Sequence, residues 1–307
     1  MALTLAITGG TGFVGRHVMA EAQARGHGVR ALARKPQRAD TGVCWVAGSL
    51  ETEAALASLV AGADAIIHIA GVTNARSRIE FDAGNAAGTA AMRAVAGTRP
   101  FVHVSSLAAR EPSLSHYGAS KRQAEDVARG VCGPLVMLRP PGVYGPGDSE
   151  LLALFKASRF GLVPVPAGAR ASMIFAPDLA RALVALAEDL AGAARTAGGC
   201  FEIDDGTGGY AQAEVAQAAA RAIGGQITAL PVPGSMLSAA AAFATAAARL
   251  RGKLPTLSFD RARYLAHRDW TANAAPLIAT GLWKPETGLA KGMALTADWY
   301  RREGWLQ

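Results

Sequence analysis

Near its start the chain reads Leu3-Thr4-Leu5-Ala6-Ile7-Thr8 and then Gly9-Gly10-Thr11-Gly12-Phe13-Val14-Gly15. The first run is typical of a buried strand, and the second opens a helical pattern. Glycines are needed at such a joint because the turn is tight, a pyrophosphate must approach the backbone, and the helix must pack close to the strand. Free N–H groups at the helix start then hold the anion. The stretch predicts a dinucleotide-binding loop with contacts from Gly9, Thr11, Gly12, Phe13, Val14 and Gly15.

The pattern around this stretch predicts an α/β fold. Further strand-like runs lie at residues 29–33, 43–47, 65–70, 101–105 and 135–138, with helical patterns at 12–25, 52–60, 86–96 and 117–129. Apolar strands that alternate with helices indicate a parallel sheet covered on both faces. We therefore expect a doubly wound Rossmann fold with a smaller, mostly helical C-terminal lobe. The dinucleotide-binding core would span residues 1–165, continued by about 172–204, and the substrate-binding lobe residues 205–307.

The composition is that of a folded protein, because 50% of the 307 residues are hydrophobic and 18% are charged. The net charge of +7 is spread along the chain, so we expect a small-molecule substrate and no nucleic acid. Cys44, Cys132 and Cys200 lie far apart and the histidines lack metal-ligand spacing, so we expect no metal and a cytoplasmic location. The longest uncharged span, residues 222–248, is broken by glycines and prolines, so we expect no membrane span. A homodimer is compatible with this sequence.

The end of the second strand bears on the choice of cofactor. An acid that binds the ribose 2′-hydroxyl of NAD usually stands there, about 20 residues after the first glycine. This chain has Ala33 instead, followed by Arg34 and Lys35. Two cations attract a 2′-phosphate, so we expect NADP to be preferred over NAD, with Arg34 as the main contact, Lys35 second and Arg16 assisting. The alternative is that these residues are solvated surface charges.

A second pattern carries acid–base chemistry. Ser105-Ser106 ends a strand, and Tyr117 and Lys121 follow at the start of a helix. Residues four apart lie on one helix face, so the ammonium group can lie beneath the phenol. A phenol has a pKa near 10, and a nearby cation favours its ionised form. We predict Ser106, Tyr117 and Lys121 as the catalytic group, with Ser105 as the alternative to Ser106 and an ordinary amphipathic helix as the alternative to the whole.

Taken together, these residues resemble the short-chain dehydrogenase/reductases, and more narrowly the extended NAD-dependent epimerase/dehydratase branch. The segments that add to the resemblance are His68-Ile69-Ala70-Gly71, Asn85-Ala86-Ala87-Gly88-Thr89 and Arg139-Pro140-Pro141-Gly142-Val143-Tyr144-Gly145-Pro146. It implies that Tyr117 is the general acid/base, that Lys121 binds the nicotinamide ribose and lowers the tyrosine pKa, and that Ser106 orients the substrate carbonyl. It also implies that Ala70 and Gly71 line the ribose, that Asn85 supports the site, and that Pro141 and Val143 meet the carboxamide.

The chain departs from the family pattern in several places. Gly48-Ser49-Leu50 stands where the family shows Gly-Asp-Leu at the adenine, so Ser49 and Leu50 would make that contact differently. Leu107-Ala108 replaces the Asp-Glu of the dehydratases, which argues against a sugar dehydratase. The segment around Arg170 and residues 176–178 matches the nucleotide-sugar pattern only loosely.

The expected lobe is mostly apolar, for example at residues 240–248, Leu254, Leu257 and Phe259. Such a lobe suits an isoprenoid, steroid-like or flavonoid-like ketone as well as a sugar. We also expect Tyr144 and Phe155 to face the substrate.

The function we expect is that of an NAD(P)-dependent oxidoreductase that transfers a hydride between nicotinamide and a carbonyl or hydroxyl carbon. One alternative is an NAD-retaining nucleotide-sugar epimerase. The other is a non-catalytic NADP-binding regulator or accessory subunit.

Overall fold

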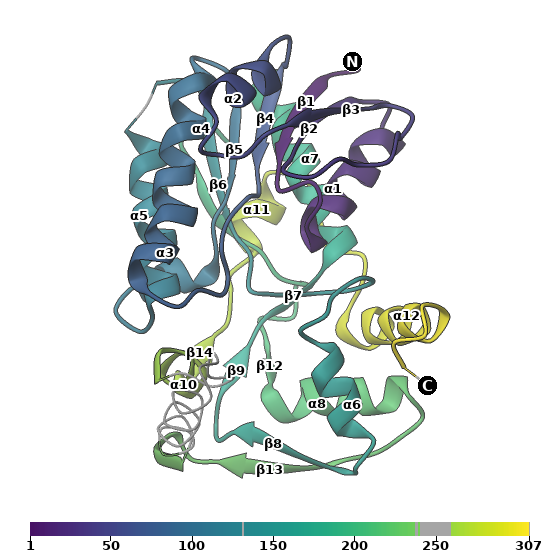
Figure 1. The fold of residues 1–307 in the computed structure, drawn as a ribbon. Helices are drawn as coiled ribbons and strands as arrows, with labels where there is room; N and C mark the ends of the chain where they lie inside the picture. Colours follow the sequence, from purple (N-terminus) through teal and green to yellow (C-terminus); the bar gives the residue numbers. More distant parts are fainter. Residues whose placement is uncertain (131, 237–238, 240–258, 307) are drawn as a thin grey trace.

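A parallel sheet of seven strands forms the centre of the protein, in the order β11-β6-β5-β4-β1-β2-β3 (Figure 1). The computed structural model describes the chain except residues 131, 237–238, 240–258 and 307. The strands are β1 (Thr4–Thr8), β2 (Gly28–Ala33), β3 (Val43–Ala47), β4 (Ala65–His68), β5 (Phe101–Val104), β6 (Leu135–Arg139) and β11 (Cys200–Glu202). The doubly wound Rossmann fold predicted from the sequence is confirmed.

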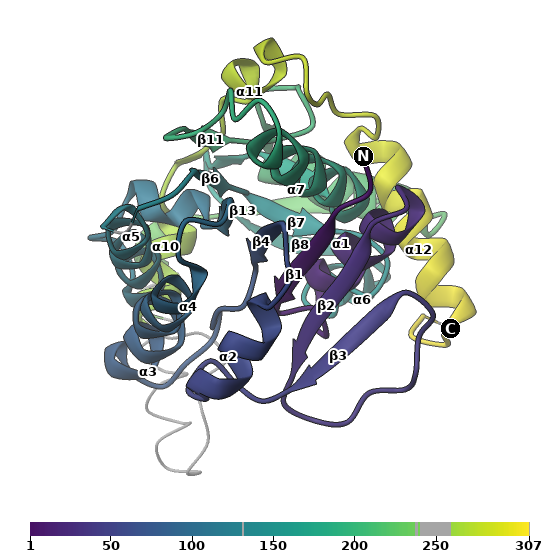
Figure 2. The same ribbon diagram turned by 90° about the horizontal axis from the view of Figure 1, so that it is seen from above.

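Helices cover both faces of this sheet, which explains why its strands are apolar throughout. Figure 2 shows α1 (Phe13–Ala24) and α7 (Ala176–Ala191) on one face, and α2 (Glu53–Val60), α4 (Gly88–Ala96) and α5 (His116–Arg129) on the other. Neighbouring residues of β1 serve opposite layers. Leu5 and Ile7 pack in the hydrophobic cluster that holds α1 and α7, whereas Ala6 packs in the cluster that holds α2 and α4.

The strand order reverses at β1, and this reversal positions the site. From β1 the chain runs outward to β2 and β3, and then crosses back to β4 on the other side of β1. Thr8 and His68, at the carboxyl ends of β1 and β4, are paired in register. Ligands of open α/β sheets bind in the crevice at such a point.

The lobe is built from two stretches of sequence that pair with each other (Figure 1). β8 (Leu162–Pro166) pairs with β13 (Thr228–Val232), and β9 (Arg170–Ala171) pairs with both β12 (Tyr210–Ala211) and β14 (Asp269–Trp270). Nearer the large sheet, β7 (Gly142–Tyr144) pairs with β10 (Met173–Phe175). The helices of the lobe are α6 (Leu152–Ser158), α8 (Gln212–Ala222), α10 (Phe259–Ala266) and α12 (Leu289–Arg302). A short helix, α11 (Ala275–Ala279), lies against the core.

The expectation that Tyr144 and Phe155 face the substrate is wrong. Both are fully buried in the lobe core, where Phe155 packs edge-on against Tyr300. Of the apolar residues expected to line the lobe, 240–248, Leu254 and Leu257 lie outside the described part of the chain. In the described ranges, no helix combines the length and apolar character that crossing a membrane requires.

Candidate active site

The loop between β1 and α1 has glycine where a side chain would collide with backbone. Gly9 has φ +76°, and a Cβ on it would lie 2.7 Å from the Ala70 nitrogen. A Cβ on Gly15 would overlap the Gly9 oxygen, so the first turn of α1 packs directly on the loop. Gly12, the N-cap of α1, offers no side-chain cap, and the first turn of the helix carries no acidic residue. The N–H groups there remain suited to an anion.

The residues predicted to bind the adenosine end lie at the edge of this loop. Arg34 and Lys35 follow directly after β2, are exposed, and form no ion pair with any residue that the structure describes. Ser49 lies in the next turn, where its Oγ accepts a hydrogen bond of 3.2 Å from the Glu51 nitrogen. The Leu50 side chain lies against α4, 2.7 Å from where a Cβ on Gly88 would stand.

A buried chain of hydrogen bonds, which sequence reasoning missed, fixes the neighbouring loop after β4. The Thr8 Oγ1 lies 2.7 Å from the His68 Nδ1 and accepts a hydrogen bond of 3.2 Å from the Ala70 nitrogen. The other ring nitrogen of His68 lies 3.2 Å from the Thr89 Oγ1. Burial lowers the pKa of His68 to about 3, and Lys121 adds to the shift. A neutral imidazole therefore holds Thr8, and through it Ala70 and Gly71, in place.

Asn85 connects that loop to the catalytic helix. It lies in a π-helical turn (Ala83–Ala87), a distortion that is frequent at functional sites. Its Oδ1 accepts from the Val72 nitrogen at 2.7 Å, and its Nδ2 donates to the Ser120 Oγ at 2.8 Å. Ser120 in turn donates to the Tyr117 carbonyl at 2.8 Å. Asn85 therefore links the loop after β4 directly to α5.

Ser106, Tyr117 and Lys121 gather around the carboxyl end of β5. Ser106 begins a short 3₁₀ turn (Leu107–Arg110), and α5 begins at His116 with Ser115 as its cap. The Ser106 hydroxyl lies near the Tyr117 phenol, and it accepts a hydrogen bond of 3.2 Å from the Ala108 nitrogen. Lys121 is buried and its Nζ donates to the Val104 oxygen at 2.7 Å. The same Nζ lies 3.8 Å from where a Cβ on Gly71 would stand, so it faces the loop after β4.

Ser105, the alternative to Ser106, is hydrogen bonded away from Tyr117. Its Oγ donates to the Glu125 Oε1 at 2.6 Å, and Arg139 binds both carboxylate oxygens of Glu125 at 2.7 Å. Successive residues of a strand point to opposite faces. Ser105 is therefore committed to a buried ion-pair network, and Ser106 is the serine that lies at Tyr117.

The pKa values of the catalytic pair differ from the simplest expectation. Burial raises the pKa of Tyr117, and the nearby Ser106 hydroxyl opposes that shift only in part. The lowering that the resemblance attributes to Lys121 is not what these residues produce by themselves. Burial also lowers the pKa of Lys121 to about 8, against the opposing charge of Glu125. The protein alone therefore keeps the phenol neutral, the form that can donate a proton.

The lowered pKa of Lys121 predicts that removing its charge stabilises the protein. Below about pH 8 the folded protein holds a buried charge that costs about 3 kcal/mol relative to the unfolded chain, judged from the fall in pKa from 10.5 to about 8. Between these two values the unfolded lysine keeps its proton while the folded one loses it, so native stability rises with pH. Lys121→Met should therefore be more stable than the native protein at pH 7, by up to about 3 kcal/mol, and the gain should shrink by about 1 kcal/mol at pH 9.

Urea unfolding of both proteins at the two pH values measures this difference. Lys284→Met, at an exposed position, is the matched control and should show no pH-dependent gain. A Lys121→Met protein that is less stable at pH 7, or a difference that does not change with pH, would contradict the assignment.

A buried apolar wall packs against Tyr117 and is built from both the core and the lobe. Its centre is Leu107, Ala108, Trp270 and Ala272, and Leu114, Tyr117, Ala171 and Tyr264 pack at its edge. The Tyr264 and Trp270 rings stack with centroids 4.5 Å apart, and the Phe81 ring lies 6.0 Å from that of Tyr117. Sequence reasoning missed these aromatic residues because nothing in their local pattern connects them to Tyr117.

Polar contacts fix this wall to the catalytic helix. The Asp260 carboxylate accepts a hydrogen bond of 2.8 Å from the His116 nitrogen, at the first residue of α5. Arg110 donates to the carbonyls of Thr271 and Asp269 at 2.9 and 2.8 Å. Pro141 follows Pro140, whose oxygen accepts a hydrogen bond of 2.9 Å from the Leu107 nitrogen of the 3₁₀ turn, whereas Val143 packs against the cluster that holds α1 and α7. The lobe is therefore attached where the reacting groups lie.

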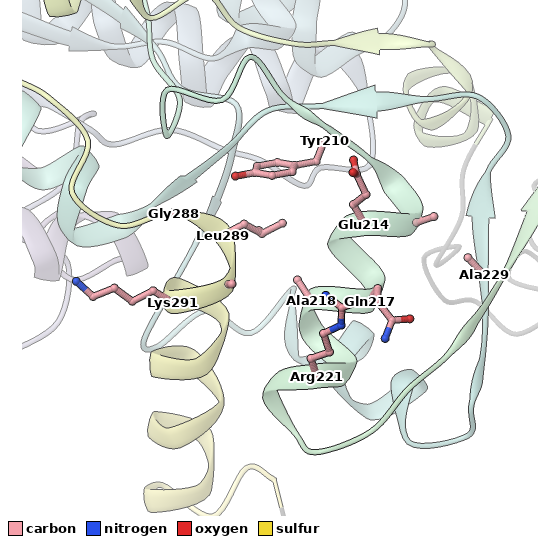
Figure 3. A pocket seen from close by; sticks show the side chains of 11 residues that line it. Tyr210, Glu214, Gln217, Ala218, Arg221, Ala229, Gly288, Leu289 and Lys291 are labelled. Atoms are coloured by element: carbon pink, nitrogen blue, oxygen red, sulfur yellow. The ribbon is translucent and has the colours of Figure 1, made fainter.

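A separate groove of about 820 Å³ lies elsewhere in the lobe, between α8 and the start of α12 (Figure 3). Tyr210, Glu214, Gln217 and Arg221 line it from one side, and Leu289 and Lys291 from the other. None of the predicted site residues lines this groove. No cluster of three or more potential metal ligands occurs in the described part of the chain.

Comparison with known proteins gives matches of two kinds. The sequence model of a family described as NAD(P)H-binding matches residues 9–189. A ceramide reductase of Caulobacter vibrioides is 39% identical, with 98% of this chain and 96% of the relative covered. A 4-hydroxy-2-methyl-3-oxo-4-farnesyl-3,4-dihydroquinoline-1-oxide ketoreductase of Stigmatella aurantiaca is 34% identical over 48% of this chain and 52% of its own.

Solved structures show the same fold at low sequence identity. The WbmH enzyme of Bordetella bronchiseptica, in complex with NAD⁺, superposes with a TM-score of 0.73 at 20% identity, with 98% of this chain and 99% of that chain covered. The UDP-N-acetylglucosamine 4-epimerase of Bacillus cereus has a TM-score of 0.71 at 18% identity, with 98% and 97% covered.

Proposed function

The chain belongs to the NAD(P)H-binding family and is an extended short-chain dehydrogenase/reductase. From this premise we propose that it is an NADPH-dependent reductase, and that its substrate is a ketone on a lipid-like molecule. The relative that matches over almost its full length is named a reductase, which supports an enzyme over a non-catalytic regulator or accessory subunit. The observation that carries the proposal is the gathering of Ser106, Tyr117 and the buried Lys121 at the carboxyl end of β5, beside the loop after β4.

The residues of the crevice fit a dinucleotide. Side chains at Gly9 and Gly15 would collide with backbone, and one at Gly71 would come within 2.8 Å of the Asn85 Oδ1. Glycine at these positions lets the loops after β1 and β4 pack tightly and so fixes the shape of the crevice. The uncapped start of α1 suits the pyrophosphate, and the buried ammonium group of Lys121, which faces Gly71, suits the hydroxyls of a ribose.

The mechanism uses three side chains. When bound, the reduced nicotinamide supplies the hydride that adds to the carbonyl carbon. Ser106 Oγ and the phenol of Tyr117 hold the carbonyl oxygen, and Tyr117 donates its proton to that oxygen as negative charge develops. Asn85, through Ser120, keeps the first turn of α5 in position for this transfer.

The proposed substrate class follows from the relatives. Leu107, Ala108 and Trp270 are buried and pack behind Tyr117. The full-length relative is named for ceramide, a lipid with long hydrocarbon chains, and the partial relative for a farnesylated ketone. Because Ser106 and Tyr117 act on a carbonyl, the substrate we propose is an N-acylated long-chain amino ketone, the oxidised counterpart of a ceramide.

A screen of such ketones and of nucleotide sugars, followed by the loss of NADPH absorbance, tests this assignment. We expect turnover with long-chain ketones and none with nucleotide sugars. Turnover of a nucleotide sugar without net change in the cofactor would instead support an epimerase.

The cofactor preference gives a further prediction. We propose that Arg34, supported by Lys35, binds the 2′-phosphate of NADPH, and a charge-assisted hydrogen bond of this kind contributes about 1.5–3 kcal/mol. Arg34→Ala should therefore raise the Kd for NADPH by roughly ten- to a hundredfold and leave that for NADH within about threefold. Arg302→Ala, an exposed arginine at the end of α12, is the control and should change neither constant. A native protein that binds NADH more tightly than NADPH would overturn the preference.

A further inference from the structure

The outer face of the β8–β13 pair is apolar and exposed. Leu162 and Leu230 are 50% and 42% exposed, and Phe160, just before β8, is 85% exposed. Pro164 is paired in register with Leu230, so both lie on this face, while Val163 and Val165 point inward and pack with Ala216. The inward side of the strand pair is already packed in the lobe core. Exposed apolar side chains that gather on the other side are typical of a surface that binds a partner or a membrane.

The two strands of this face and the residues next to them carry an excess of positive charge, while Glu214 lines a groove together with Ala229 of β13. Residues 152–172 and 215–236, which contain both strands and the adjoining ends of α6 and α8, hold Lys156, Arg159, Arg170 and Arg221 but no aspartate or glutamate. Lys156 and Arg159 are exposed and immediately precede Phe160. Exposed apolar side chains flanked by cations match the chemistry of an anionic bilayer surface.

The position of the face connects it to the candidate active site. Figure 1 shows β8 and β13 at the end of the molecule opposite the seven-stranded sheet, with β9, β14 and α10 between them and α5. β8 leads within four residues to β9, which pairs with β14 and so with Trp270 of the wall at Tyr117. A surface in contact with this face would therefore lie on the lobe side of the crevice.

From these observations we infer that Phe160, Leu162, Pro164 and Leu230 form a docking face that binds the surface of an anionic lipid bilayer. The apolar side chains enter the interfacial region, and Lys156 and Arg159 contact the headgroups. The reason for such docking rests on the proposed function, because a ketone on a lipid is presented at a membrane. Binding itself needs no catalysis, so the two proposals can fail separately.

Sedimentation of the full chain with vesicles tests the inference, using phosphatidylcholine alone and a mixture of three parts phosphatidylcholine with one part phosphatidylglycerol. The native protein should bind the mixed vesicles, and the affinity should fall with added salt. Phe160→Ser/Leu230→Ser should weaken that binding by about tenfold or more, and Lys156→Gln/Arg159→Gln should weaken binding to the mixed vesicles alone.

The matched control is Ile278→Ser/Leu295→Ser, which removes two exposed apolar side chains on α11 and α12. It should bind vesicles as the native protein does. The free energy of unfolding in urea should stay close to that of the native protein in all of these variants, which shows that they are folded.

Three results would overturn the inference. The first is a native protein that does not sediment with mixed vesicles. The second is an equal loss of binding in the Ile278/Leu295 control and in the Phe160/Leu230 variant. The third is a native dimer in light scattering that the Phe160/Leu230 variant loses while its vesicle binding is unchanged. The last result would make this face an interface between copies of the chain.

Discussion

Replacing Tyr117 by Phe lowers the turnover number for ketone reduction by about a thousandfold, because positioned proton transfer contributes roughly 10²–10⁴-fold. The variant keeps the ring, its packing against Phe81 and the surrounding apolar cluster, and loses only the phenolic oxygen. Folding and the Kd for NADPH should therefore stay close to those of the native protein. Stopped-flow measurement of NADPH oxidation at saturating ketone gives the turnover number.

Tyr210→Phe is the matched control for this experiment. Tyr210 also donates a hydrogen bond from its phenol, at 2.6 Å to the Asp205 Oδ2, but it lies in the lobe at the groove between α8 and α12. Its turnover should remain within a few-fold of the native value. If Tyr117→Phe retained turnover to the same extent, the proton donor would be another group and the proposed role of Tyr117 would be wrong.

Replacing Glu125 by Ala destabilises the fold by about 3–5 kcal/mol, the usual effect of removing one partner from a buried ion pair. The Glu125 side chain is 0% exposed and is held by two hydrogen bonds of 2.7 Å from Arg139 and one of 2.6 Å from Ser105. Its removal leaves the Arg139 charge half-buried without this partner, beneath the strand that carries Ser106. Urea unfolding measures the change.

Asp126→Ala is the control at the neighbouring position. Asp126 is exposed and pairs with arginines on the helix surface, an arrangement that contributes little to stability. Its free energy of unfolding should change by less than about 1 kcal/mol. Equal stability of Glu125→Ala and Asp126→Ala would show that the network around Glu125 is not what fixes β5, β6 and α5 together.

The sequence predicted those parts of the protein that depend on local spacing. The glycines at 9, 12 and 15 follow the first strand at fixed intervals because one turn imposes them, and Tyr117 and Lys121 share a face because a helix repeats. From such intervals the parallel sheet and the loop after β1 could be predicted, and the structure confirms this fold. The catalytic and cofactor roles remain predictions.

What escaped prediction depends on contacts between distant parts of the chain. Trp270 and Asp260 reach Tyr117 and His116 only because β14 pairs with β9 and α10 lies beside the start of α5. The expectation for Tyr144 and Phe155 is wrong because an aromatic residue after β6 has the same local sequence pattern whether it faces a ligand or fills a core. The raised pKa of Tyr117 also depends on burial, which spacing does not reveal.

The central claim is that the chain reduces a ketone with a hydride from NADPH. The most direct measurement uses NADPH with deuterium at the transferable position of C4, an N-acylated long-chain amino ketone, and mass spectrometry of the lipid product. Direct hydride transfer predicts an alcohol with one deuterium on the new carbinol carbon and one NADP⁺ formed for each alcohol. An alcohol without deuterium, or a rearranged product with the cofactor returned unchanged, would contradict it.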